Sequence, residues 1–136
     1  MLSPKEIVDK MYNNDDYSKW LGINFNELKR GHCCIQMQIR SEMTNGFDVA
    51  HGGITFAFAD SAFAFASNSL GRHAVSIETS ISHTRPVFVG DTITAIATQK
   101  NVSNKLGIFE VVVKNQNDKI VALFKGTVFR KEDIWT

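Results

Sequence analysis

A single carboxylate, Asp60, interrupts the most apolar run of the chain, residues 53–66. A carboxylate surrounded by apolar side chains is costly unless it is paired, hydrogen-bonded or protonated. Desolvation raises the pKa of an acid, which makes it a better general base near neutral pH, and a nucleophilic role is also open. Because isolated buried acids cluster at functional sites, Asp60 is the first candidate catalytic residue; a carboxylate held by a backbone amide is the alternative.

Two glycines, Gly52 and Gly53, precede the helix that we expect over the same stretch. The first N–H groups of a helix lack intrahelical acceptors and carry the positive end of its dipole. Glycine lets a ligand approach the backbone, so the Gly52 N–H is a candidate oxyanion donor for a carbonyl under attack. A helix-entry turn that merely requires glycine is the other interpretation.

Polar residues before the glycines offer further candidates. His51 could hydrogen-bond a substrate carbonyl or fix the loop. Asn45 could orient a water molecule or the carbonyl, although Asn45-Gly46 is first of all a turn signal. The remaining histidines share no spacing and are interpreted as structural: His32, His73 and His83. No metal-ligand spacing, serine nucleophile elbow or phosphate-binding loop occurs, so we expect neither metal nor cofactor.

Asp60 follows Gly52 by eight residues, about two helical turns. Asp60 and the Gly52 N–H of one chain therefore cannot reach the same carbonyl unless the chain folds back on itself. A second copy would solve this, with Asp60 of one chain facing Gly52 of the other across a twofold axis. The sequence thus favours a homodimer with shared active sites.

The central element that must position these groups is a helix over residues 54–70. Its five alanines are strong helix formers, and Gly71 stands where a C-cap glycine belongs. The helix is apolar around nearly its whole circumference and must be enclosed on several sides. The hydrophobic period then switches to two in four segments joined by short turns, which predicts an antiparallel meander.

The first forty residues supply the remaining elements. Residues 3–6 carry a capping serine, a proline and a glutamate in helix-start spacing, so a short helix is expected to end near Asn13. Residues 20–31 are a plausible strand, and residues 33–40 alternate as a half-buried strand does. The simplest arrangement is an α+β domain in which an antiparallel sheet curls around the central helix.

Composition limits the classes of partner. The 136 residues, 43% hydrophobic and 21% charged, suit one globular domain over residues 1–136. The net charge of +1, with no basic stripe, favours neither nucleic acid nor an anionic membrane. We expect no signal segment and no membrane span. The adjacent Cys33 and Cys34 make a poor disulfide pair and fit a reducing cytoplasm, the expected localisation.

Residues 45–71, NGFDVAHGGITFAFADSAFAFASNSLG, resemble the signature of hotdog-fold acyl-CoA thioesterases, specifically the PaaI-type branch of phenylacetic acid degradation. Two later segments, SHTRPVFVGDTITAIA and VALFKGTVFRK, are similar to the same branch, so the resemblance extends from the first strand to near the C-terminus. It implies a hotdog fold, with a sheet wrapped around a long central helix. It also implies hydrolysis of an acyl-CoA substrate, with an aryl or medium-chain acyl group, to free acid and CoA.

The resemblance assigns roles to residues of this sequence. Asp60 takes the position of the catalytic carboxylate, and Gly52 that of the amide that polarises the thioester carbonyl. Asn45 and His51 match residues near the thioester, and Ser76 matches a water-orienting hydroxyl. Arg85 and Lys105 match basic residues that meet the CoA phosphates. The resemblance further implies active sites at a dimer interface, with dimers pairing into a homotetramer.

Two other functions compete with hydrolysis. A hotdog hydratase or dehydratase would use a histidine with a helix acid, as His51 and Asp60 could provide, but the longer proline-glycine loop of those enzymes is missing. A non-catalytic acyl-CoA-binding protein would use the same pocket and should carry an attached DNA-binding or partner domain, for which we expect no room in this chain.

Overall fold

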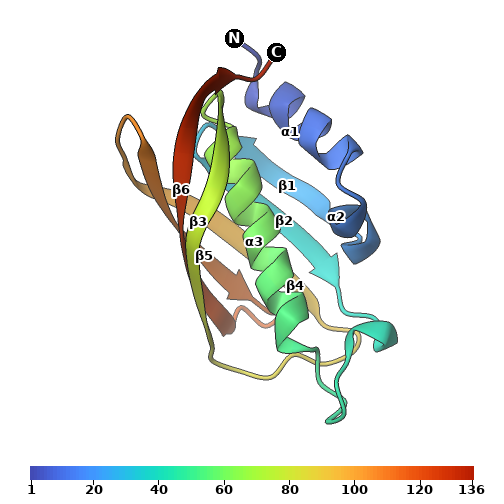
Figure 1. The fold of residues 1–136 in the computed structure, drawn as a ribbon. Coiled ribbons are helices and arrows are strands. Elements are labelled where there is room, and N and C mark those ends of the chain that lie inside the picture. Colours follow the sequence, from blue (N-terminus) through green and yellow to red (C-terminus); the bar gives the residue numbers. More distant parts are fainter.

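The computed structural model describes residues 1–136. The chain forms one curved sheet with a helix on its concave side (Figure 1). The six antiparallel strands follow the order β1-β2-β4-β5-β6-β3. Their bounds are β1 (Asn24–Lys29), β2 (His32–Gln38), β3 (Arg72–His83), β4 (Thr92–Val102), β5 (Leu106–Lys114) and β6 (Ile120–Ile134). The central helix is α3 (Gly52–Asn68), against which the shorter α1 (Pro4–Asn13) and α2 (Asp16–Leu21) pack. The predicted α+β arrangement is confirmed.

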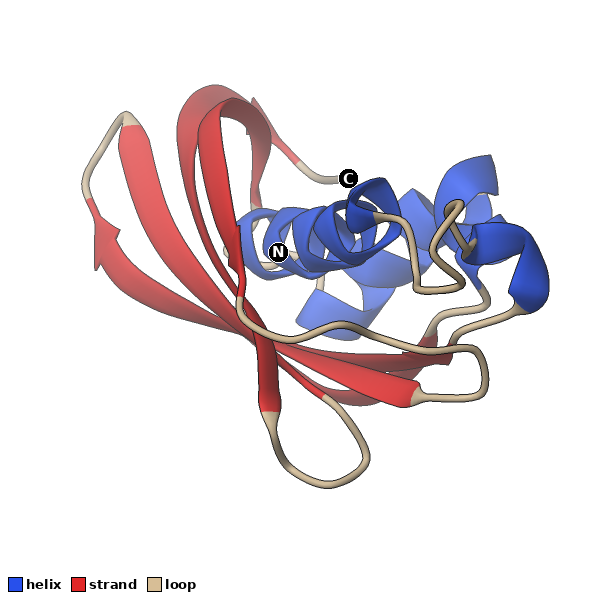
Figure 2. Ribbon diagram, turned by 90° about the horizontal axis from the view of Figure 1, so that it is seen from below, coloured by secondary structure: helices blue, strands red, loops and turns tan.

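Helix α3 occupies the concave side of the sheet (Figure 2). Its large aromatic residues Phe58, Phe63 and Phe65 are fully buried against the strands and α1, and alanines between them let the sheet approach closely. Burial of this kind removes apolar surface from water and stabilises the fold by about 25 cal/mol for each Å² removed. The predicted enclosure of α3 is therefore confirmed for most of its circumference.

One side of α3 stays only partly covered. The residues on it recur at intervals of three and four, as one face of a helix does: Gly53, Phe56, Ala57, Asp60, Ser61 and Ala64. We call this set the open stripe. Asp60 lies in its middle, so the one carboxylate of the helix is on the one side that the sheet does not cover.

The ends of α3 differ slightly from those expected. The helix begins at Gly52 rather than residue 54, because the Nδ1 atom of His51 accepts a hydrogen bond from the Gly53 N–H at 3.0 Å and caps the first turn. It ends at Asn68, with Ser69 as C-cap. Gly71 adopts the positive φ of +113° that favours glycine, two residues beyond that cap.

The strand expected over residues 20–31 was wrong in its first part. Residues 16–21 form α2, and β1 begins only at Asn24. Asp15 caps α2 by accepting a hydrogen bond from the Ser18 N–H at 3.0 Å, and Gly22 ends it with a φ of +78°. With six residues the helix is too short to show a hydrophobic period, so only its two caps could have indicated it.

The predicted meander is confirmed for β4, β5 and β6 but wrong for β3. Strand β3 pairs with β6 at the far edge of the sheet, not with its successor β4. The connecting residues 84–91 cross the end of the sheet, where the Ala50 N–H donates to the Val87 carbonyl at 2.7 Å. As an edge strand, β3 leaves Val75 and Ile77 exposed at 48% and 57%.

We expect Gly126→Ala to destabilise the fold by about 1–3 kcal/mol, the usual cost of overpacking. A Cβ on Gly126 of β6 would stand 2.6 Å from the Cζ atom of Phe63, a fully buried ring of α3. Gly46→Ala is the matched control, because a Cβ there meets nothing within 4 Å. Urea unfolding of both variants measures the difference; equal midpoints would show that the core relaxes around the added methyl group.

Candidate active site

Asp60 carries a carboxylate that no other group in the chain satisfies. It is half-buried on the open stripe and takes part in no hydrogen bond or ion pair of the structure. Desolvation raises the pKa of Asp60, and the negative charge of Asp15 raises it further. The alternative of a carboxylate held by a backbone amide is therefore not what the structure shows.

A hollow of about 380 Å³ lies next to Asp60, between α3 and α2. Ala57 and Ser61 of α3 line one side of it, and Tyr17 and Ser18 of α2 line the other. The Ser18 hydroxyl donates to Oδ2 of Asp15 at 2.6 Å and lies 2.8 Å from the Ser61 hydroxyl. These α2 residues were not predicted from the sequence, because residues 16–21 were expected to be loop and strand rather than a helix.

The N-terminus of α3 presents an unused donor. The Gly53 N–H donates to Nδ1 of His51, and the Ile54 N–H donates to the His51 carbonyl at 2.9 Å. The Gly52 N–H has no acceptor within the chain. A helix-terminal N–H in this state can donate to an oxyanion. His51 thus fixes the loop, one of its two predicted roles, and keeps its Nε2 atom free of hydrogen bonds.

A second hollow, of about 330 Å³, opens beside Gly52. Arg85 lines it, as does His83, whose Nε2 atom would stand 3.4 Å from a Cβ on Gly52. The structure therefore places the predicted residue Arg85 near the helix N-terminus. It also places His83 there, a residue interpreted from the sequence as structural. The only sequence signal for this position was that His83 stands two residues before the candidate Arg85.

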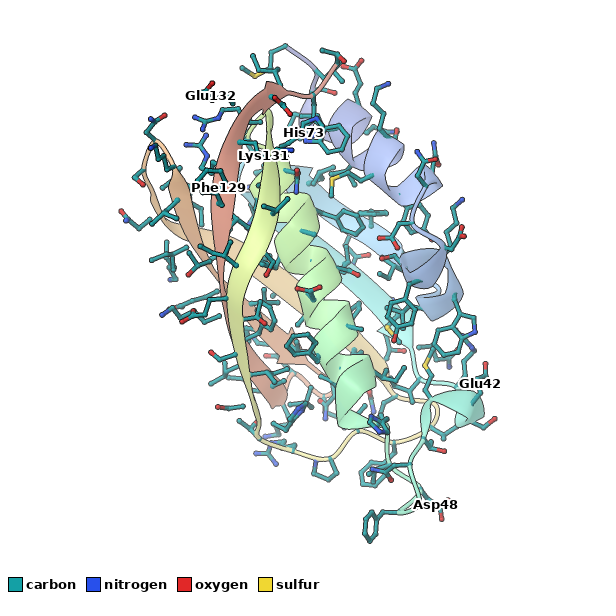
Figure 3. All side chains as sticks on the ribbon, viewed as in Figure 1. Glu42, Asp48, His73, Phe129, Lys131 and Glu132 are labelled. Carbon is teal, nitrogen blue, oxygen red and sulfur yellow. The ribbon has the colours of Figure 1, made fainter.

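Asn45 lies in the turn that its Asn-Gly pair predicted. Its side-chain oxygen accepts a hydrogen bond from the Phe47 N–H at 2.8 Å, and its own N–H donates to the Val49 carbonyl at 2.8 Å. Its side-chain amide donates to no group in the chain. The turn ends at Asp48, which Figure 3 labels at the tip of the loop before α3.

Two predicted residues lie apart from both hollows. Ser76 is exposed on β3, where it pairs with Val128. Lys105 lies in the turn between β4 and β5 and lines a third hollow, of about 510 Å³, with Arg72 and Arg130. That hollow is at the end of the sheet where Figure 3 labels Phe129 and Lys131, opposite the Asp48 loop. One chain thus brings Gly52 and Arg85 together but not Arg85 and Lys105.

Other kinds of chemistry find little in the structure to support them. No three His, Cys, Asp or Glu side chains converge as a metal site would require. Burial raises the pKa of the Cys33 thiol to about 12, so it is a core side chain rather than a nucleophile. None of the helices combines the length and the apolar character that crossing a membrane requires.

Comparison with known proteins gives one family. The model of the thioesterase superfamily matches residues 47–122. A putative esterase of Archaeoglobus fulgidus is 40% identical over 93% of this chain and 82% of its own length. The acyl-coenzyme A thioesterase PaaI of Escherichia coli is 40% identical over 88% of this chain and 86% of its own length.

The solved structures agree. The E. coli PaaI protein from the phenylacetic acid degradation operon superposes with a TM-score of 0.95 and 37% identity, covering 98% of this chain and 96% of that one. Its strands and central helix therefore correspond to those described above. The chain belongs to the thioesterase superfamily: it has the hotdog fold of the PaaI-type proteins and is a thioester hydrolase.

Proposed function

We propose that the chain hydrolyses an acyl-CoA with an aryl or medium-chain acyl group to the free acid and CoA. The observation that carries this proposal is the unpartnered Asp60 carboxylate beside a hollow on the open stripe. Similarity to an E. coli acyl-coenzyme A thioesterase supports CoA as the thiol. One domain over residues 1–136 carries the activity, and the free cysteines Cys33 and Cys34 fit the reducing cytoplasm as its location.

The chemistry needs a donor for the carbonyl oxygen and a base for water. The Gly52 N–H donates to the thioester oxygen and stabilises the negative charge that develops there. Asp60 takes a proton from a water molecule while the water oxygen attacks the carbonyl carbon, and the C–S bond then breaks. The proton passes to the leaving sulfur, so acid and free thiol are the products. Attack by the Asp60 oxygen itself, followed by hydrolysis of the anhydride, is the other route.

Two neighbouring residues assist at the carbonyl. Because Nδ1 of His51 accepts from the Gly53 N–H, the neutral ring carries its proton on Nε2. That N–H is a second donor for the substrate, and the side-chain amide of Asn45 is a third. The hydratase alternative requires a histidine that works as acid and base; the capping contact of His51 instead suits a fixed donor.

The complete site combines two copies of the chain. Gly52 and Asp60 are about 12 Å apart along the axis of α3, too far to act on one carbonyl. A second copy placed across β3 and the open stripe would cover Val75 and Ile77 and bring its own Asp60 to Gly52 of the first. Ser76 on β3 would then face the shared site.

The proposed binding of CoA also calls for more than one copy of the chain. Arg85 and Lys105 lie at opposite ends of one sheet, so they can meet the phosphates of one CoA only if they come from different copies. The dimer already provides a second copy, and we propose that two such dimers pair into a homotetramer with shared active sites.

Asp60→Asn is expected to keep the fold and to lower turnover at least ~10²-fold, the usual contribution of a general base. His51→Ala should cost less, because it removes a helix cap and one of several donors but leaves the base in place. Free thiol release from phenylacetyl-CoA measures both. Near-wild-type hydrolysis by Asp60→Asn would remove Asp60 from the mechanism.

Activity should rise with pH as Asp60 loses its proton, because the base acts in its ionised form. Asp15→Asn removes the neighbouring charge that raises the pKa of Asp60, and therefore shifts the acidic limb of the kcat/KM profile to lower pH. Asparagine can still cap α2 at Ser18. Asp16→Asn, which alters the next carboxylate along the chain, is the control and should leave the limb in place; an unmoved limb in Asp15→Asn would contradict the coupling.

Gly52→Pro removes the proposed oxyanion donor with little risk to the helix. Residue 52 is the first of α3, where proline is tolerated, and His51 has the ψ of 136° that a residue before proline adopts. We expect a loss of about 10²–10³-fold in kcat. Gly52→Ala keeps the N–H while adding the same Cβ beside His83, so it should retain most of the activity.

Mixing Gly52→Pro with Asp60→Asn tests the shared site. Each homodimer lacks one group at both sites, whereas a mixed dimer assembles one intact site of two. Random exchange makes half of the dimers mixed, so co-refolded variants should recover roughly a quarter of wild-type activity. No recovery from folded, exchanged variants would place the whole site within one chain.

A further inference from the structure

One wall of the hollow beside Asp60 belongs to α2, outside the sheet. Tyr17 of α2 lines this wall, while Phe56 and Ala57 of the open stripe line the other. The volume of about 380 Å³ falls within the range of small-molecule sites. An acyl group whose carbonyl carbon lies near Asp60 therefore has space on the α2 side.

Hydrogen bonds attach α2 to the residue next to Asp60. Ser18 is 1% exposed, and its only hydroxyl proton is donated to Asp15, so Ser61 must donate to Ser18 across the 2.8 Å between their oxygens. Asp15 also accepts from the Ser18 N–H. This series of bonds holds the start of α2, including Tyr17, at a fixed place against α3.

The ring of Tyr17 is itself held in place. It stacks on Trp20, with ring centroids 5.9 Å apart and an angle of 7° between the planes. The Arg40 guanidinium lies 5.0 Å from the Trp20 ring and donates to the Leu21 carbonyl at 3.2 Å. Tyr17 nevertheless remains 51% exposed. The part of Tyr17 that stays exposed is therefore an aromatic surface that Trp20 holds in place.

We propose that the hollow between α2 and α3 receives the acyl group, and that Tyr17 is a specificity-determining residue that favours acyl groups ending in an aromatic ring. This inference rests on the proposed hydrolysis of acyl-CoA at Asp60. An aromatic ring can pack on Tyr17 with Phe56 at the other wall, and offset or edge-on aromatic pairs are favourable beyond their buried area. An acetyl group offers almost no surface to either ring.

The test compares kcat/KM for phenylacetyl-CoA and acetyl-CoA, measured by free thiol release with the full chain. In Tyr17→Ala, we expect the ratio of the two values to fall about tenfold, the effect of losing one aromatic contact and its buried area. Tyr17→Phe keeps the ring and should restore the ratio. Leu123→Ala is the matched control, because Leu123 is similarly exposed at 44% but lies on β6 in another hollow.

A change in the opposite wall makes the test independent of α2. Ala57→Leu fills the hollow from the α3 side and should lower the ratio of kcat/KM for phenylacetyl-CoA to that for acetyl-CoA. This variant keeps the test informative if Tyr17→Ala fails to fold. A ratio unchanged in both variants, or equal losses for both esters, would overturn the acyl pocket while leaving the hydrolysis intact. A wild-type chain that releases thiol from neither ester would instead overturn the proposed function, and the pocket with it.

Discussion

The covering of α3 is the constraint on which the rest of the structure depends. A helix that is apolar on nearly every side must be surrounded, and a single curved sheet surrounds it only in part (Figure 2). What the sheet leaves open is the stripe with Asp60 at its centre. The packing of the core and the exposure of the catalytic candidate Asp60 thus have one cause. No strand covers the open stripe, and the helix is therefore accessible from solvent along it.

The same incomplete covering accounts for the two elements that adjoin the stripe. Helix α2 covers part of it through the contact between Ser18 and Ser61, and β3 ends the sheet with an exposed apolar edge. Each contributes only a few residues to the core that α3 forms with the strands: Leu21 of α2, and Ala74 and Ile81 of β3. Both instead set the surroundings of Asp60, where partial desolvation and the charge of Asp15 raise the pKa of the acid.

Most of the fold could be predicted because α3 is rich in strong helix formers and the longer strands alternate clearly between apolar and polar residues. The position of β3 could not, since short connections indicate antiparallel pairing but not which neighbour a strand takes; contacts such as that of Ala50 with Val87 decide this. For the site, Asp60, Gly52 and His51 could be proposed from the sequence because they stand in one stretch. Tyr17 and His83 come from distant segments, and only the folded chain brings them beside Asp60 and Gly52.

Helix α2 lies outside the ladder of hydrogen bonds that joins the strands, and it packs on the domain through Leu21 in the core and through the contact of Ser18 with Ser61. Substitutions on its exposed face therefore leave the ladder and the buried phenylalanines untouched. The proposed base Asp60 and the proposed donor Gly52 lie on α3, whereas Tyr17, the proposed specificity-determining residue, lies on α2. Part of the proposed substrate choice thereby belongs to a helix that does not carry the proposed base, so that descendants of one ancestral hydrolase could change their substrates at Tyr17 without rebuilding the machinery that cleaves them.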